Sequence, residues 1–180
     1  MNPIHLQTKQ KNKGMNAIFL IFKLIGKAWN IAFPTHPSQV TITKTTDGDS
    51  LEGICKDGIT HKIRLQGIDA PELGQDHGWK SKSALAKLVQ GKTVSLENPE
   101  TDKFGRTAAN VVTPDKKRVE EILVAQGDAW ACDYRATHRQ KRAQKSAQQN
   151  KNGLWANPNA KAPWKYRKNK GKGTDGPDIF

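Results

Sequence analysis

Acidic residues and cysteines are both scarce in this chain of 180 residues. Its 17 Asp and Glu stand against 30 Lys and Arg, which gives a formal net charge of +13 and a pI of about 9.8. This balance favours polyanionic partners, either nucleic acid or an anionic membrane surface; the alternative is merely a soluble basic protein. Two cysteines, Cys55 and Cys132, exclude a four-thiolate zinc site. They leave open one disulfide in an exported protein or two buried free thiols.

The positive charge is concentrated at the two ends of the chain. Residues 1–40 contain five Lys and no acid, and residues 161–180 carry a net charge of +4, as much as all of residues 41–160. The mixed charge of the middle is typical of a globular domain. Basic ends usually stay solvated and add sequence-independent attraction to phosphate, so we predict a basic C-terminal tail over residues 158–180.

The chain also lacks an uninterrupted apolar run of the length that an ordinary transmembrane span requires. Ala17–Phe22 follows three lysines, as in an export signal, but Lys23 and Lys27 interrupt the apolar run and no clean A-x-A site follows. We predict that residues 1–38 comprise a linker at their end and, before it, an atypical export signal, a membrane anchor or an interfacial helix with membrane contact through residues 16–33. The alternative is a helix packed on its own domain. The expected location is secreted, periplasmic or membrane-anchored.

The middle of the chain predicts mostly strands. Alternating and β-branched stretches indicate five of them, over residues 39–46, 50–56, 59–68, 92–98 and 106–113. Asp57-Gly58 predicts a hairpin turn between the second and third strands. Trp79 and three aliphatic residues at helical spacing predict a helix over residues 79–90, ended by Gly91, and two more helices follow the last strand. We therefore expect an α+β fold that is mainly β: a five-stranded Greek-key OB-fold barrel with about three helices.

Carboxylates cluster where the predicted strands begin and end. Asp47 and Asp49 lie one residue apart, so on a strand they share a face. Asp69 and Glu72 follow the third strand, which Pro71 must end because it has no N–H to donate to a sheet. Acids gathered at one rim repel one another unless a cation joins them. A hard metal ion with oxygen ligands is the natural partner of such a cluster.

Two arginines accompany these acids. Arg64 lies on the strand face opposite Ile63 and Leu65, which allows it to point away from the interior and toward the acids. Arg106 follows a glycine turn in the segment TDKFGR. Two guanidinium groups, a hard cation and a free carboxylate are what phosphodiester hydrolysis requires. Each feature alone is weak, since an Asp-Gly-Asp segment is a common turn and a lone strand arginine is usually exposed.

In this order and spacing, the segments TTDGDS, IRLQGIDAPE, TDKFGRTAANV, LVAQGDAW and NGLW resemble the thermonuclease (staphylococcal-nuclease-like) family. The resemblance covers residues 39–157, and NPNAKAPWKYRK, residues 157–168, resembles an extension of many bacterial relatives. It implies an OB-fold barrel and a calcium-dependent phosphodiesterase that splits the P–O5′ bond of DNA and RNA and leaves 3′-phosphates. We expect a monomer. The alternatives are a catalytically inactive OB-fold module that binds nucleic acid, and a membrane-tethered adaptor for a protein partner.

The resemblance assigns a role to each of several residues. They are the catalytic Arg64, Glu72 and Arg106; the calcium ligands Asp49, Asp69 and Ala70, the last through its carbonyl; the outer-shell acid Asp47; and the substrate contacts Phe104 and Tyr134. Glu72 is expected to reach the ion through water. Phe104 stands where the family has a Tyr, so a hydroxyl expected near the substrate phosphate is missing, which predicts weaker binding of a terminal phosphate.

Overall fold

The computed structural model describes residues 36–132 and 135–169. The predictions for the apolar N-terminal segment, and the substrate contact assigned to Tyr134, lie outside these residues. The strands are β1 (Gln39–Thr45), β2 (Ser50–Ile54), β3 (Thr60–Leu65), β4 (Ile68–Asp69), β5 (Thr93–Thr101), β6 (Thr107–Val112) and β7 (Trp130–Ala131). The helices are α2 (Gly78–Val89), α3 (Val119–Gln126), α4 (His138–Gln149), the single 3-10 turn η1 (Gly153–Ala156) and α5 (Pro163–Asn169).

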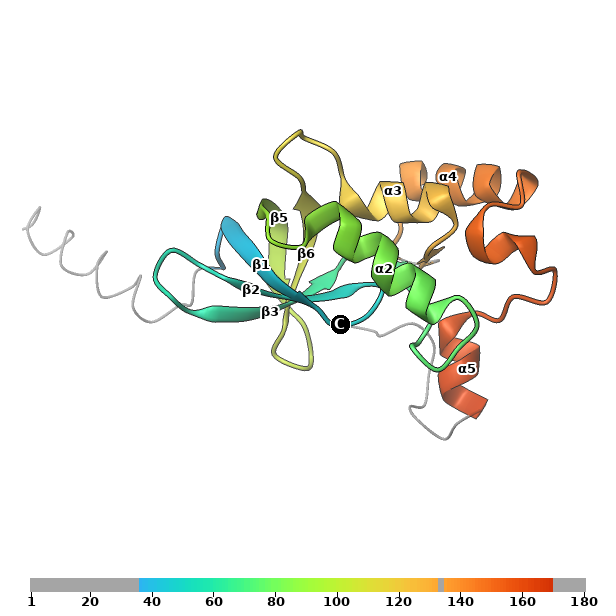
Figure 1. Ribbon diagram of the computed structural model, residues 1–180, viewed down its shortest axis with the longest axis horizontal. Coiled ribbons are helices and arrows are strands. Elements are labelled where there is room, and N and C mark those ends of the chain that lie inside the picture. Colours follow the sequence, from blue (N-terminus) through green and yellow to red (C-terminus); the bar gives the residue numbers. More distant parts are fainter. Residues whose placement is uncertain (1–35, 133–134, 170–180) are drawn as a thin grey trace, which may run out of the picture. The chain divides into compact units, whose positions relative to one another are not determined.

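Five strands close into a barrel in the order β1-β2-β3-β6-β5, with β5 returning to β1 (Figure 1). All neighbours are antiparallel except β3 and β6, which run parallel with Ile63 opposite Thr107. The hairpin between β2 and β3 turns at Gly58, which has a φ of 83°, while Asp57 accepts a hydrogen bond from the N–H of Ile59. The predicted mainly β fold with a five-stranded barrel is therefore confirmed.

The core fills the barrel and continues under the helices. Alternate residues of the strands point inward, and the fully buried ones include Ile42, Leu51, Ile63 and Val111. The helices contribute apolar residues at helical spacing, among them Leu85, Val89, Val119 and Leu123. Burial of this aliphatic surface is the main source of stability, because each such side chain contributes about 1.5–3 kcal/mol when fully buried. The polar loops at the barrel rim rest on this core.

Helices α2, α3 and α4 lie together beside the barrel (Figure 1), with α3 packed against both of the others. Helix α3 ends at Gly127, whose φ of 74° allows its N–H to close the last turn. Helix α4 begins with a capping box, in which Thr137 and Gln140 each accept the other's backbone N–H. This cap is needed because α4 is strongly polar and buries few apolar side chains.

The third strand departs from the prediction, and the helix predicted over residues 79–90 is present as α2 but buries a different face. Residues 59–68 are not one strand: β3 ends at Leu65, and Gly67 turns the chain with a φ of 73° into the separate strand β4, which pairs with β7. Asp69 therefore lies on a second small sheet rather than at the end of the barrel strand. Trp79 is 65% exposed, because the buried face of α2 runs through Ser81, Leu85 and Val89 instead.

The segment predicted to be a basic tail is folded over its described part. Residues 163–169 form α5, with Ala162 and Pro163 buried at its start. The ring of Trp164 contacts that of Trp130 at a centroid separation of 5.6 Å, and the Tyr166 hydroxyl donates to the Gly74 carbonyl at 2.5 Å. The aromatic residues that lie among the lysines supply the contacts that hold this segment in place. Net charge alone, on which the prediction of a tail was based, does not reveal such contacts.

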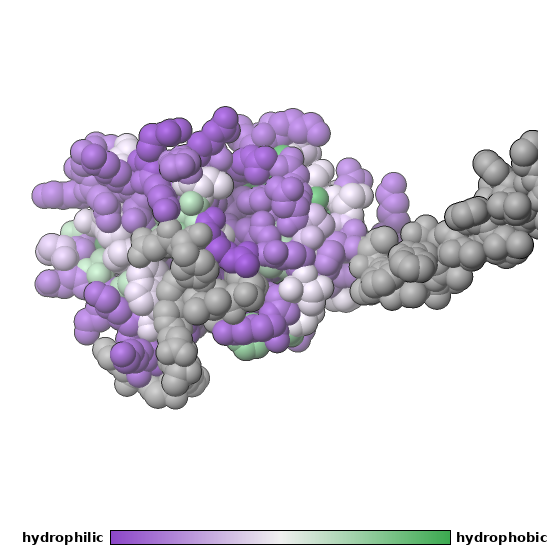
Figure 2. All heavy atoms as spheres, turned by 180° about the vertical axis from the view of Figure 1, so that it is seen from behind, coloured by the Kyte–Doolittle hydropathy of each residue, from purple (hydrophilic) through white to green (hydrophobic). Residues whose placement is uncertain are grey.

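The two cysteines do not pair, and the surface is mostly hydrophilic on one face (Figure 2). Cys132 is buried and Cys55 partly exposed, and no disulfide joins them in the structure. Figure 2 shows hydrophilic side chains over most of the face that it displays, with only small hydrophobic areas. Within residues 36–132 and 135–169, no helix is long and apolar enough to cross a bilayer.

One acid is buried away from the barrel rim, in the first turn of α3. Glu120 is 1% exposed, and its Oε1 accepts the N–H of Val111 at 2.6 Å. Burial raises the pKa of Glu120 to about 8, because desolvation outweighs the hydrogen bond from Val111 and the nearby charge of Arg118. Glu120 is therefore largely protonated in the folded protein at neutral pH.

We expect Glu120→Gln to reduce the loss of stability as the pH rises. The contribution of wild-type Glu120 is fully present below the ordinary Glu pKa of 4.5, where the unfolded chain is also protonated, and is lost as the pH rises to about 8. The neutral Gln avoids this loss and should exceed wild type in free energy of unfolding at pH 8 by about 1 kcal/mol or more, since one pKa unit corresponds to about 1.4 kcal/mol.

Urea unfolding at pH 5 and pH 8 measures this difference, with Glu121→Gln on the same helical turn as the control. Parallel pH profiles for wild type and Glu120→Gln would contradict the assignment of a protonated Glu120.

Candidate active site

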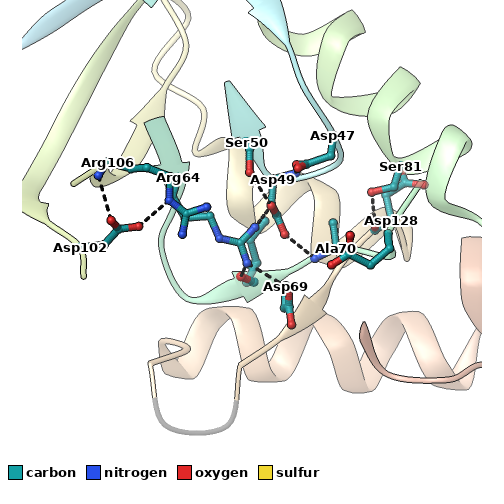
Figure 3. A network of polar contacts seen from close by, with 12 residues as sticks. Asp47, Asp49, Ser50, Arg64, Asp69, Ala70, Ser81, Asp102, Arg106 and Asp128 are labelled. Carbon is teal, nitrogen blue, oxygen red and sulfur yellow. Dashed lines mark hydrogen bonds and ion pairs between the residues drawn. The ribbon is translucent and has the colours of Figure 1, made fainter. Parts of the chain in front are cut away.

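Three charged side chains meet at the barrel rim and are nearly buried. Asp49, Arg64 and Asp69 are exposed by only 3%, 6% and 1%. Arg64 on β3 forms ion pairs with the Oδ1 atoms of both acids, at 3.0 Å from its Nη2 in the case of Asp69 (Figure 3). A charge buried to this extent is tolerated only when it is paired, so Arg64 joins β3, β4 and the bend before β2 at one point.

The bend that carries Asp49 is held by polar contacts rather than by a sheet. Asp47 Oδ1 accepts the N–H of Asp49 at 3.0 Å, so the two acids do not share a strand face as predicted. Asp49 Oδ1 accepts the Ser50 hydroxyl at 3.1 Å, and its Oδ2 accepts the N–H of Ala70 at 2.6 Å. Figure 3 shows Asp49 between Ser50, Arg64 and Ala70. Asp49 is therefore fixed from three sides.

A glycine is required beside this bend. A Cβ added to Gly48 would lie 2.0 Å from the Ser81 hydroxyl and 2.6 Å from the Cβ of Ala70. Ser81 is itself anchored, since its hydroxyl donates to the carbonyl of Asp128 at 2.6 Å. Real side chains do not approach so closely, so any larger residue at position 48 would push the bend away from Ala70.

The second predicted arginine is held by an acid that the prediction did not single out. Asp102 is 4% exposed and accepts the N–H groups of Phe104 and Arg106, both at 2.9 Å. Its other oxygen accepts the Nε of Arg106 at 2.6 Å, which fixes the guanidinium group at the end of the β5–β6 turn. Phe104 is 60% exposed, with its ring 5.1 Å from the Arg106 guanidinium carbon.

Glu72 and Arg167 complete the rim. The Glu72 side chain is 42% exposed, whereas the side chains of Asp49 and Asp69 are exposed by only 5% and 2%. Arg167 from α5 pairs with Glu72 Oε1 at 3.0 Å and with Asp69 Oδ2 at 2.8 Å. Burial lowers the pKa of Arg167, but the hydrogen bonds and charges of Asp69 and Glu72 outweigh this and raise it above its ordinary value.

These side chains line one cleft of about 100 Å³. Its lining contains seven residues that the sequence predicted, namely Asp47, Asp49, Arg64, Asp69, Ala70, Glu72 and Arg106, together with Ser50, Pro71 and Arg167. Phe104 is not among the lining residues, and Tyr134 lies outside the described residues. Asp102, which holds Arg106, and Arg167 are parts of the site that the sequence did not predict. Asp102 could have been found as the acid in TDKFGR, two residues before Phe104. No local sequence pattern indicates Arg167.

The donor set fits a hard cation, although the carboxylates alone do not form a cage. In the described part of the chain, no group of three or more His, Cys, Asp and Glu side chains is placed to hold a metal. The cleft nevertheless presents four carboxylates against the two guanidinium groups of Arg64 and Arg167, with Arg106 paired to Asp102. The Oδ2 atom of Asp49 accepts a hydrogen bond from Ala70 and that of Asp69 accepts one from Arg167, and a carboxylate oxygen can accept two. Carbonyl and water oxygens commonly complete such sites.

Comparison with known proteins shows what the chain is similar to. A sequence model described as "Staphylococcal nuclease homologue" matches residues 62–157. The chain is 35% identical over 130 residues to an "Uncharacterized endonuclease" of Escherichia coli O157:H7, covering 72% of this chain and 84% of that one. It is 33% identical over 138 residues to a "Micrococcal nuclease" of Shigella flexneri, covering 71% and 79%. An "Uncharacterized endonuclease" of Haemophilus influenzae is 35% identical over 155 residues, covering 86% and 84%.

We expect Asp102→Ala to lower the free energy of unfolding by about 1–3 kcal/mol, because two backbone N–H groups and the Arg106 side chain lose their acceptor. Asp102→Asn keeps an oxygen acceptor and should cost less. Urea unfolding of both variants measures the difference. Asp57→Ala is the matched control, since Asp57 also accepts an N–H but lies on an exposed turn, where about 0.5 kcal/mol is the usual limit. Equal losses for Asp102→Ala and Asp57→Ala would contradict this role for Asp102.

Proposed function

Since the chain belongs to the family of staphylococcal nuclease homologues, we propose that it is a calcium-dependent nuclease that hydrolyses the phosphodiester bonds of DNA and RNA. The endonuclease and nuclease names of its relatives support the nuclease activity itself. The preference for calcium, the use of both nucleic acids and the release of 3′-phosphates are the finer parts of the proposal.

The observation that carries the proposal is the cleft in which acids and arginines converge. Arg64 comes from β3, Glu72 from the loop after β4 and Arg106 from the turn before β6, yet all three line the same space. An ion-pair network that serves only stability does not require a half-exposed acid beside the buried ones. A hydrolase does, because its base must reach water while its other charges stay fixed.

Glu72 is the residue suited to accept a proton. Its carboxylate is accessible, and its backbone is fixed by a turn in which Gln75 donates its N–H to the Glu72 carbonyl at 2.8 Å. In the proposed reaction, Glu72 takes a proton from a water molecule whose oxygen attacks phosphorus. The P–O5′ bond breaks, the 5′ oxygen leaves and gains a proton from solvent, and the phosphate stays on the 3′ oxygen.

The arginines are suited to the phosphate oxygens. The contacts of Arg64 with Asp49, Asp69 and the Ile68 carbonyl use three of the five N–H groups of a guanidinium, so two remain that can donate to a phosphate bound in the same cleft. Arg106 is 23% exposed at its side chain while Asp102 fixes its orientation. Donors that are fixed before the substrate arrives stabilise the charge that develops on phosphorus without reorganising.

Asp49 and Asp69 would hold the calcium ion, with the carbonyl of Ala70 as a third ligand and Asp47 as an outer acid. A bound cation of this kind would supply further stabilisation of negative charge on the phosphate. Calcium is preferred over magnesium in the proposal because calcium accepts irregular sets of 6–8 oxygen ligands, whereas magnesium requires a near-ideal octahedron.

Nucleic acid is the proposed substrate because of charge. The chain carries a formal net charge of +13, which attracts the phosphate backbone independently of sequence. The same charge would serve a catalytically inactive module that only binds nucleic acid, so the activity measurements below distinguish the two.

We predict that the purified protein degrades single-stranded DNA and RNA in calcium and loses this activity in excess chelator. Release of acid-soluble nucleotides measures the rate, and magnesium should replace calcium poorly. Undiminished cleavage in chelator would contradict the role of the cation. Tight binding of DNA with no cleavage in any divalent cation would favour the inactive binding module.

Glu72→Gln should separate binding from chemistry. Gln is nearly isosteric and can still hydrogen-bond water, but it cannot accept a proton as a carboxylate does. We expect nearly native affinity for a 3′,5′-bisphosphate nucleotide in calcium and a fall in turnover of at least about 10²-fold, the low end for loss of a general base.

Equilibrium titration and single-turnover cleavage on the same preparation provide both values. Glu52→Gln is the matched control, because Glu52 pairs with Lys44 and does not line the cleft. Normal cleavage by Glu72→Gln would move the base role to another residue, and lost binding would make Glu72 chiefly a metal-site residue.

A further inference from the structure

Helix α5 contributes a third arginine to the cleft from outside the region that matches the family, residues 62–157. Arg167 makes three hydrogen bonds to two acids. Its Nη1 and Nη2 donate to the two oxygens of Asp69 at 3.2 and 2.8 Å, and Nη1 also donates to Glu72 Oε1 at 3.0 Å. The planar guanidinium fork thus spans from a buried acid to the accessible one.

The position of α5 does not depend on Arg167 alone. A helix of seven residues is too short to be stable by itself, so its tertiary contacts must fix it. Trp164 packs against Trp130, and Tyr166 donates to the carbonyl of Gly74, in the loop that follows Glu72. The backbone carbonyl of Lys161 accepts the side-chain amide of Gln75 in the same loop. These contacts remain when the Arg167 side chain is removed.

The Glu72 carboxylate, in contrast, has little else to orient it. Gln75 accepts the Glu72 N–H at 3.2 Å and fixes its backbone, but this leaves the side-chain torsions unconstrained. Across residues 36–132 and 135–169, Arg167 is the cation that forms an ion pair with Glu72. A half-exposed glutamate has several accessible rotamers, and a residue that acts on water must occupy one of them.

Electrostatics requires the same bridge. Asp69 is nearly buried and already paired with Arg64, and a second carboxylate drawn close to it would repel it in a medium of low dielectric constant. Arg167 removes this repulsion by placing its guanidinium between the two acids.

We propose that Arg167 is a positioning residue of the nuclease site, which holds the Glu72 carboxylate beside Asp69 and makes helix α5 part of the active site. This inference rests on the proposed function. It assigns to Arg167 no contact with substrate and no proton transfer, and it predicts that the barrel without α5 is folded but slow.

The test compares Arg167→Ala and Arg167→Lys with Lys165→Ala, an exposed cation of the same helix. With single-stranded DNA and calcium, Arg167→Ala should lower kcat by about 10–100-fold, the usual effect of losing a group that orients a site residue. KM should change by less than about threefold, since the lost interaction serves the reaction rather than binding. Arg167→Lys should recover only part of kcat, because one ammonium cannot reproduce the fork. Lys165→Ala should match wild type.

Two further measurements separate positioning from folding and from metal binding. The tryptophan fluorescence of Arg167→Ala should match that of wild type, since Trp164 and Trp130 keep their contact, while its Tm should fall because the buried Asp69 loses two hydrogen bonds. Calcium affinity, measured by calorimetry, should be equal to or tighter than that of wild type, because removal of a cation leaves the cleft more negative.

Wild-type kcat in Arg167→Ala would overturn the inference. A higher kcat would also overturn it, since Arg167 would then compete with the cation for Asp69. A fall in kcat that appears only together with a changed fluorescence signal would assign Arg167 to docking of α5 and reject the positioning role. The proposed nuclease function and the role of Arg167 can be rejected separately. A wild-type protein that is inactive in every divalent cation would reject both of them. An active wild type with an equally active Arg167→Ala would reject only the role of Arg167.

Discussion

The pairing of Arg64 with Asp49 and Asp69 is the interaction on which the geometry of the cleft depends. All three side chains are almost fully buried, and an unpaired buried charge would cost several kcal/mol. Arg64 cannot move without breaking the ion pair of Asp49 and leaving Asp69 with Arg167 as its remaining partner, so β3, β4 and the bend before β2 are fixed relative to one another. The backbone supports this, since Leu65 donates its N–H to the carbonyl of Asp49 and Ala70 donates to its side chain. The same buried charges therefore stabilise the barrel rim and shape the cleft, and the proposed reaction would use them as well.

The barrel could be predicted because its signals are local. Alternating β-branched residues indicated the strands, and Gly58, Gly91 and Gly127 marked turns or helix ends where the backbone adopts a positive φ. The interpretation of residues 59–68 as one strand was wrong because apolar alternation continues through a break that Gly67 makes. The need for Gly at that point comes from its φ of 73°, which residues with a side chain rarely adopt, and an added Cβ would also lie 3.2 Å from the carbonyl oxygen of Arg135. Similarly, Asp47 and Asp49 were expected on one strand face, yet the first caps the backbone of the second.

The candidate site could be predicted where its residues lie in short sequence motifs that follow one another in a recognisable order. Arg64, Glu72 and Arg106 were named from such segments, and the structure brings them into one cleft. Arg167 could not be found in this way, because its contact with Asp69 joins residues 98 positions apart and its own surroundings have the composition of a solvated tail. The segment is nevertheless folded against the domain, through the burial of Ala162, the Trp164–Trp130 contact and the Tyr166 hydrogen bond. It therefore forms one side of the cleft.

The central claim is that this acid and arginine cleft is where a divalent cation and a phosphodiester meet. A crystal structure of the protein with calcium and a 3′,5′-bisphosphate nucleotide tests this claim most directly. We expect a calcium ion held by Asp49, Asp69 and the carbonyl of Ala70, with the 5′-phosphate against Arg64 and Arg106 and a water molecule within reach of Glu72. Calcium bound at another place, or a nucleotide phosphate away from both arginines, would contradict the account.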